Sequence, residues 1–162
     1  MRVYAFGLEQ HTYAANGSHT SDLYYDSLAG KLLGYLDTST NTTGFYLTDT
    51  LGSVLASFSN TDKSAAINGN QVFGPYGNFR DVQGSFNTLK GFTGQDNDSL
   101  THLDYYGSRY YDQVAGVFLS ADVKQGNMQG MNPYAYVGGN PETRNDPTGQ
   151  MYAPNSAGGE HL

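Results

Sequence analysis

The sequence contains no cysteine, and only 14% of its 162 residues are charged. Without cysteine there is no disulfide framework, no thiolate nucleophile and no cysteine-ligated metal. Lysine and arginine number 8 against 15 aspartates and glutamates, which gives a net charge of −7. A chain this acidic lacks the basic face that nucleic acids and anionic membrane surfaces require, so we expect neither as a partner.

Long apolar segments are also missing. No stretch approaches the roughly 20 apolar residues of a membrane span. The N-terminus reaches Glu9 without the apolar run of a signal peptide. We therefore expect this chain to be one part of a longer protein.

Strand and turn signals recur along the whole chain, and tyrosine is abundant, with 14 residues. Residues 22–26 read as a strand that returns as residues 31–36 after a Ser-Leu-Ala-Gly turn. A tyrosine-rich hairpin is expected at 103–119, with alternate rings buried in the sheet. The predicted fold class is mostly β: antiparallel hairpin repeats with long loops and at most a short helical turn, around Pro133–Tyr136.

One hairpin pattern occurs twice. Residues 25–33 and residues 111–119 both read Tyr-Asp-x-x-Ala-Gly-x-apolar-Leu. In this pattern the aspartate can bond to the turn backbone and the glycine can take a positive φ. A repeated hairpin that cannot bury its own face implies that such units stack into a larger sheet.

Further motifs follow this hairpin in a fixed order. They are Asp49–Val54, Phe73–Gly77, Phe92–Gln95, Leu103–Asp112, Gly116–Asp122 and Asn132–Pro141. The ordered set, from about Tyr24 to Gly149, resembles the Rhs-associated core of the Rhs or YD-repeat family, which includes teneurin-like and Tc-toxin C-component-like proteins.

The resemblance implies a role in packaging. In that family the repeats wind into a hollow β-shell, the core closes one end, and the shell encloses a C-terminal toxin or effector. By this resemblance residues 1–23 are an N-terminal strand and turn segment, 24–149 the core, and 150–162 a linker toward a further C-terminal domain. The implied partners are the upstream shell and downstream effector of the same polypeptide, and the implied localisation is secreted or cell-surface.

The resemblance also implies an intramolecular aspartyl protease. By matched position its catalytic pair is Asp122 and Asp146, and the cut falls between Gln150 and Met151. Such a pair needs two adjacent carboxylates that share one proton. Arg109 is expected to satisfy buried carbonyls or a carboxylate rather than to act in the chemistry. The Pro-x-Gly that follows the first aspartate in the family is replaced here by Val-Lys-Gln.

Two alternatives stay open, and the replacement favours the first. One is a non-enzymatic shell segment whose protease site has decayed. The other is an extracellular β assembly module, such as a fibre or adhesin subunit, that associates through its sheet edges. The sequence predicts no cofactor, and the four histidines have no recognised metal spacing.

Overall fold

The computed structural model describes residues 2–5, 9–61, 64–123 and 132–154, and almost all of its regular structure is antiparallel β. Eight strands form one sheet in sequential order. They are β1 (Arg2–Ala5), β2 (Glu9–Tyr13), β3 (His19–Leu28), β4 (Lys31–Asp37), β5 (Thr42–Thr48), β6 (Val54–Thr61), β7 (Ser64–Phe73) and β8 (Phe79–Gly84). This meander confirms the predicted hairpin architecture.

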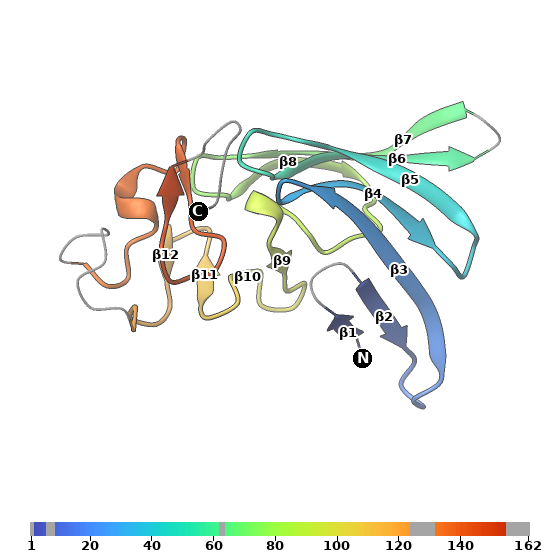
Figure 1. Ribbon diagram of the computed structural model, residues 1–162, viewed down its shortest axis with the longest axis horizontal. Coiled ribbons are helices and arrows are strands. Elements are labelled where there is room, and N and C mark those ends of the chain that lie inside the picture. Colours follow the sequence, from blue (N-terminus) through green and yellow to red (C-terminus); the bar gives the residue numbers. More distant parts are fainter. Residues whose placement is uncertain (1, 6–8, 62–63, 124–131, 155–162) are drawn as a thin grey trace.

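Two smaller sheets follow. The first has the order β12-β11-β10-β9 and the second pairs β13 with β14. The strands are β9 (Asp96–Asn97), β10 (Leu103–Tyr105), β11 (Tyr110–Asp112), β12 (Val117–Phe118), β13 (Arg144–Asn145) and β14 (Ala153–Pro154). Figure 1 shows the long strands sweeping across the molecule, with β10–β12 grouped at one end.

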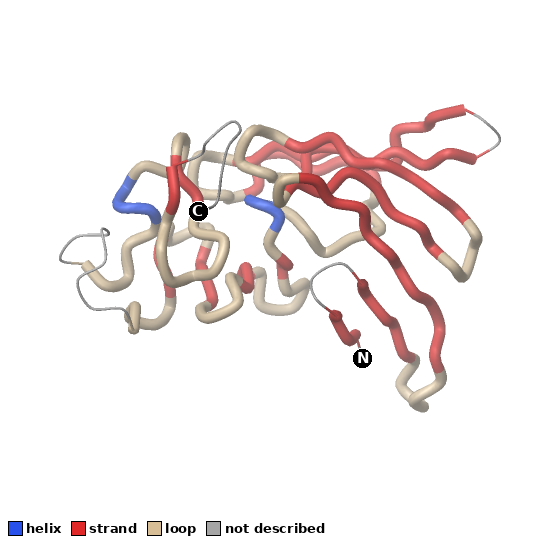
Figure 2. The backbone as a smooth tube through the Cα atoms, in the orientation of Figure 1, coloured by secondary structure: helices blue, strands red, loops and turns tan. Residues whose placement is uncertain are grey.

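Helical structure in the described part is limited to two short 3₁₀ turns, η1 (Phe92–Gly94) and η2 (Val137–Gly139). They are the only helical segments in Figure 2. The second lies just after the predicted Pro133–Tyr136 position. Gly138 there has φ +63°, and this left-handed residue limits η2 to one turn. No helix of the described residues is long and apolar enough to cross a membrane.

The large sheet buries one face. Side chains of its central strands, mostly at alternate positions, form a hydrophobic cluster of Leu23, Tyr25, Leu32, Tyr35, Tyr46 and Val54. The intervening positions point to the other face, where Phe45 and Phe58 stack at 4.8 Å between ring centroids. This alternation follows from the two-residue period of a strand.

The two repeated hairpins adopt different turns. Leu28 pairs with Lys31 across Ala29 and Gly30, which have φ of 51° and 75°. The second hairpin is wider, because Asp112 pairs with Val117 and accepts backbone N–H groups from Val114 and Ala115. Both glycines of the repeat, Gly30 and Gly116, take the predicted positive φ. The predicted bonds from the turn backbone to the aspartate form at Asp112.

Gly77, in the turn between β7 and β8, lies closely against Phe92 of η1. Its φ is +89°, and a Cβ there would lie 2.5 Å from Cδ1 of Phe92. We expect Gly77→Ala to lower the free energy of unfolding by about 2–4 kcal/mol, because overpacking adds to backbone strain. Gly17→Ala is the matched control, since Gly17 has φ +82° but no atom within 4 Å of such a Cβ. Urea denaturation measures both, and equal losses would refute the packing argument.

Candidate functional site

Aromatic rings form the core beneath the small sheet. Phe92, Tyr106, Tyr111, Phe118 and Tyr136 are each at most 2% exposed and pack on one another. The hydroxyl of Tyr106 contacts Thr93 Oγ1 at 2.8 Å and donates to the Tyr136 hydroxyl at 3.3 Å. Burial raises the pKa of Tyr106 and of Tyr136, so both rings stay neutral.

The tyrosines of this hairpin alternate as predicted. Tyr106 and Tyr111 are buried, whereas Tyr105 and Tyr110 are 44% and 48% exposed and lie side by side at 5.1 Å between centroids. The buried rings pack beneath the polar side chains of the candidate site.

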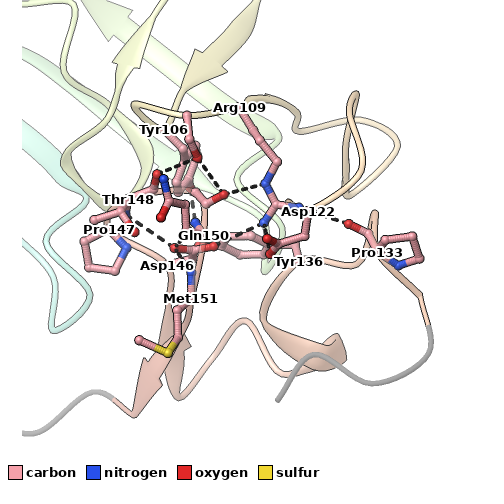
Figure 3. A network of polar contacts seen from close by, with 12 residues as sticks. Tyr106, Arg109, Asp122, Pro133, Tyr136, Asp146, Pro147, Thr148, Gln150 and Met151 are labelled. Carbon is pink, nitrogen blue, oxygen red and sulfur yellow. Dashed lines mark hydrogen bonds and ion pairs between the residues drawn. The ribbon is translucent and has the colours of Figure 1, made fainter. Parts of the chain in front are cut away.

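Arg109 lies at the edge of this aromatic core and joins the two predicted aspartates. Its Nη2 is 3.2 Å from Oδ2 of Asp122 and 3.4 Å from Oδ2 of Asp146. All three side chains are at most 3% exposed. Figure 3 shows the guanidinium between the two carboxylates. The structure therefore brings together two residues that are 24 positions apart in the sequence.

The same guanidinium also holds the backbone. Its Nε donates to the carbonyl of Gly149 at 2.5 Å, and its Nη1 donates to that of Pro133 at 3.0 Å. Its central carbon lies 3.6 Å from the centroid of the Phe118 ring. Arg109 thus satisfies buried carbonyls and carboxylates together, as the sequence predicted.

Asp146 is positioned by its own Asp-Pro-Thr-Gly turn. Its Oδ1 accepts backbone N–H groups from Thr148 at 3.3 Å, Gln150 at 3.1 Å and Met151 at 3.1 Å. Gly149 has φ +68°, and a Cβ there would lie 2.9 Å from Tyr106 O. Glycine is therefore required where this turn packs against the hairpin.

Asp122 is positioned without a following Pro-x-Gly, since Val123, Lys124 and Gln125 come after it in the sequence. Its backbone N–H donates to the carbonyl of Pro133 at 3.0 Å, the same carbonyl that accepts from Arg109. The preceding strand β12 pairs in antiparallel fashion with the same loop, where the Phe118 N–H donates to the Tyr134 carbonyl at 2.9 Å. These contacts compensate for the missing turn and keep the Asp122 carboxylate on Arg109.

Charge is partly balanced within this site. Burial lowers the pKa of Arg109, while Asp122 and Asp146 oppose that shift. A guanidinium stays protonated in proteins, so one positive charge faces two carboxyl groups. The predicted cut site is the Gln150–Met151 bond, and the Met151 N–H of this bond donates to the Asp146 carboxylate. The cut site therefore lies directly beside Asp146.

Asp104 on β10 is a third buried carboxyl group, and the sequence pattern did not indicate its burial. It is 0% exposed, and its Oδ1 accepts from Asn97 Nδ2 at 2.9 Å and Gln113 Nε2 at 2.7 Å. Its Oδ2 has no hydrogen-bond partner within the described ranges. Burial raises the pKa of Asp104 to about 7, against the effect of these two hydrogen bonds.

Sequence spacing also missed a histidine pair. The β2–β3 hairpin brings His11 and His19 onto the carboxylate of Asp22. The hydrogen bond with Asp22 raises the pKa of His11, and bonds from His19 and His11 lower the pKa of Asp22. The signal in the sequence is that the two histidines flank the Asn16–Gly17 turn, which places them on facing strands.

Comparison with known proteins agrees with this architecture. Residues 8–141 match the family model described as Teneurin YD-shell. The chain belongs to the teneurin YD-shell family. It is 34% identical to Teneurin-1 of Gallus gallus over 107 residues, which are 65% of this chain and 4% of that protein. It is 44% identical to the toxin subunit YenC1 of Yersinia entomophaga over 59 residues, 36% of this chain and 6% of that subunit.

Solved YD-shell structures share the fold. A chain in the crystal structure titled TcdB2-TccC3-Cdc42 superimposes with a TM-score of 0.74 at 23% identity, over 92% of this chain and 8% of its own length. A chain of TcdB2-TccC3 without its hypervariable C-terminal region gives a TM-score of 0.73 at 25% identity, over 91% of this chain and 7% of its own length. The chain therefore spans less than a tenth of these relatives, and it is a shell-forming module of the Rhs or YD-repeat type.

Proposed function

We propose that this chain closes one end of a YD-repeat shell that encloses a C-terminal toxin or effector, and that it cuts itself from that cargo between Gln150 and Met151. The large sheet supplies the last turns of the shell wall. The small sheet and the segment 132–149 supply the closing element. The relatives that support this role include the toxin subunit YenC1. The structurally similar TcdB2-TccC3 has a hypervariable C-terminal region that its crystal structure omits.

The observation that carries the cleavage proposal is the position of the candidate bond against the carboxylate pair. Asp146 Oδ1 lies 3.1 Å from the nitrogen that would leave as the new amine. Asp122 and Asp146 both contact one nitrogen of Arg109, so the two carboxyl groups are close neighbours. Two adjacent carboxyl groups and a peptide bond within hydrogen-bond reach are what acid–base hydrolysis requires.

The roles follow from these positions. With one proton on the pair, Asp122 takes a proton from a water molecule that adds to the Gln150 carbonyl carbon. Asp146 then donates the proton of the pair to the Met151 nitrogen, which gives up its N–H bond to Oδ1 as it becomes tetrahedral and the C–N bond breaks. The products are a Gln150 carboxylic acid and a Met151 amine, and the proton taken from water stays on Asp122. Arg109 holds the pair in place and balances its single negative charge.

Intact mass measurement tests this proposal. A chain extended beyond Leu162 with a stable reporter domain is expressed as wild type, Asp122→Asn, Asp146→Asn and Asp26→Asn, the last an exposed control on β3. We expect the wild type and the control to be cleaved between Gln150 and Met151, and the two site variants to remain uncleaved. Removing one member of an acid–base pair lowers the rate by about 10²–10⁴-fold.

Two outcomes would contradict the proposal in different ways. A cut that persists in Asp146→Asn, in protein with an unchanged thermal melting curve, would remove this aspartate from the chemistry. A wild-type chain that stays whole would favour the second candidate, a non-enzymatic closing segment. The contact that favours this alternative is Arg109 between the carboxylates, because a guanidinium occupies the place where a catalytic pair shares its proton.

A further inference from the structure

The β2–β3 hairpin carries a cluster of metal-ligating side chains, His11, His19 and Asp22. This hairpin lies at the opposite end of the molecule from β10–β12 (Figure 1). Nδ1 of His11 lies 2.6 Å and Nε2 of His19 lies 2.5 Å from the same oxygen, Oδ1 of Asp22. One ligand atom from each of these residues lies within 4.8 Å of the others. Two imidazoles and a carboxylate are a ligand set that Zn²⁺ prefers in proteins.

A β-bulge creates this grouping. His11 and Asp22 are direct cross-strand partners and therefore share a face. His19 is three positions before Asp22, which in a regular strand would place it on the opposite face. The register shifts between Thr12 and Tyr13, so that Thr20 is an extra residue on β3 and His19 is turned toward Asp22. The Thr20 hydroxyl fastens the bulge through a 2.8 Å bond to the Thr12 carbonyl.

The contacts of His11 match those of a metal-bound imidazole. Its second nitrogen, Nε2, lies 3.4 Å from Oε2 of Glu9. A neutral imidazole has one N–H and one lone pair, so it cannot donate to Asp22 and Glu9 at once. With a cation on Nδ1, the lone pair binds the metal and Nε2–H donates to Glu9. Histidine ligands commonly donate their other ring N–H to a carboxylate in this way.

We infer that His11, His19 and Asp22 form a binding site for a divalent transition-metal cation such as Zn²⁺. Glu9 orients His11 as a positioning residue. The three protein ligands leave at least one coordination position, which faces solvent because the His19 side chain is 47% exposed. That position would take water or a ligand atom from a neighbouring molecule. Atoms bound at about 2.1 Å to a tetrahedral ion lie about 3.4 Å apart, so both imidazoles move slightly away from the Asp22 oxygen on binding.

The site is tested with the full chain, free of affinity tags, by calorimetric titration with Zn²⁺ and by the visible absorption of bound Co²⁺. We expect one ion per chain in the wild type and in His102→Asn, which removes a histidine outside the cluster and suits the positive φ of that position. His19→Ala and Asp22→Asn should abolish saturable binding. Glu9→Gln should weaken it by about 10-fold.

Loss of metal binding in His19→Ala would not result from unfolding, because His19 lies at an exposed strand end. Its alanine variant should melt at the same temperature as metal-free wild type. Equal binding in wild type and His19→Ala would overturn the assignment. So would equal losses in His102→Asn and His19→Ala, which indicate diffuse binding by surface histidines. Saturable binding that is lost in His19→Ala and Asp22→Asn but kept in His102→Asn supports it.

Discussion

Replacing Arg109 by methionine is expected to lower the free energy of unfolding by about 3–5 kcal/mol, the usual cost of breaking a buried ion pair by removing one partner. The substitution leaves the buried carboxyl groups of Asp122 and Asp146 without their positive charge. It also leaves the carbonyls of Gly149 and Pro133 without the donors that Arg109 provides. Methionine fills much of the same volume, so the loss reports charge and hydrogen bonds rather than a cavity.

Urea denaturation of purified protein measures this effect. Arg80→Met is the matched control, since Arg80 is exposed on β8 and its loss should cost less than about 0.5 kcal/mol. The variant that also carries Asp122→Asn and Asp146→Asn should regain part of the stability, because no charge is then left buried. A triple variant as unstable as the sum of its parts would show that the charges do not interact.

Asp104→Asn is expected to stabilise the protein at pH 8 by about 2–4 kcal/mol and to have little effect near pH 4. Burial raises the pKa of Asp104 to about 7 in the folded protein, compared with an ordinary value of about 3.9 in the unfolded chain. Between these values the folded state keeps a proton that the unfolded state has released. The contribution of Asp104 to stability is therefore complete below pH 4 and declines as the pH rises through 7.

Asparagine reproduces the protonated carboxyl at every pH, so the variant should lack this decline. Unfolding free energies at pH 4.5, 6 and 8 for wild type and variant give the result directly. Asp81→Asn, at an exposed position of β8, corrects for the change in net charge. A constant difference between Asp104→Asn and wild type across this pH range would show that Asp104 stays ionised when buried.

Local pattern was sufficient to predict the elements whose side chains alternate. The β3–β4 hairpin and the in-and-out tyrosines of β10 and β11 follow from a two-residue period and from Gly-containing turns. The resemblance to Rhs cores added the long-range pairing of Asp122 with Asp146, which no local rule supplies. The bond from Met151 to Asp146 depends on the turn conformation and was visible only in the structure.

Elements whose stability comes from pairing with a neighbour were missed. The strand β2 (Glu9–Tyr13) is polar along its length, and it forms because β3 provides its hydrogen-bond partners. The histidine cluster depends on a one-residue bulge, and a sequence pattern of strict alternation places His19 on the wrong face. Asp104 reads as a solvent-facing strand residue, yet Gln113 and Asn97 take the place of water around it.

The segment that follows the candidate bond is also held to the protein by non-covalent contacts. Ala153 and Pro154 pair with β13, and Tyr152 is 8% exposed, with the Arg144 guanidinium 4.7 Å from its ring centroid. A severed chain would therefore remain docked, and cleavage and departure would be separate kinetic steps. In the proposed closed shell, confinement of the cargo would keep the effective concentration of Tyr152 high and favour rebinding. Once such a shell opened, burial of one side chain, about 1.5–3 kcal/mol, would be too weak to retain the cargo.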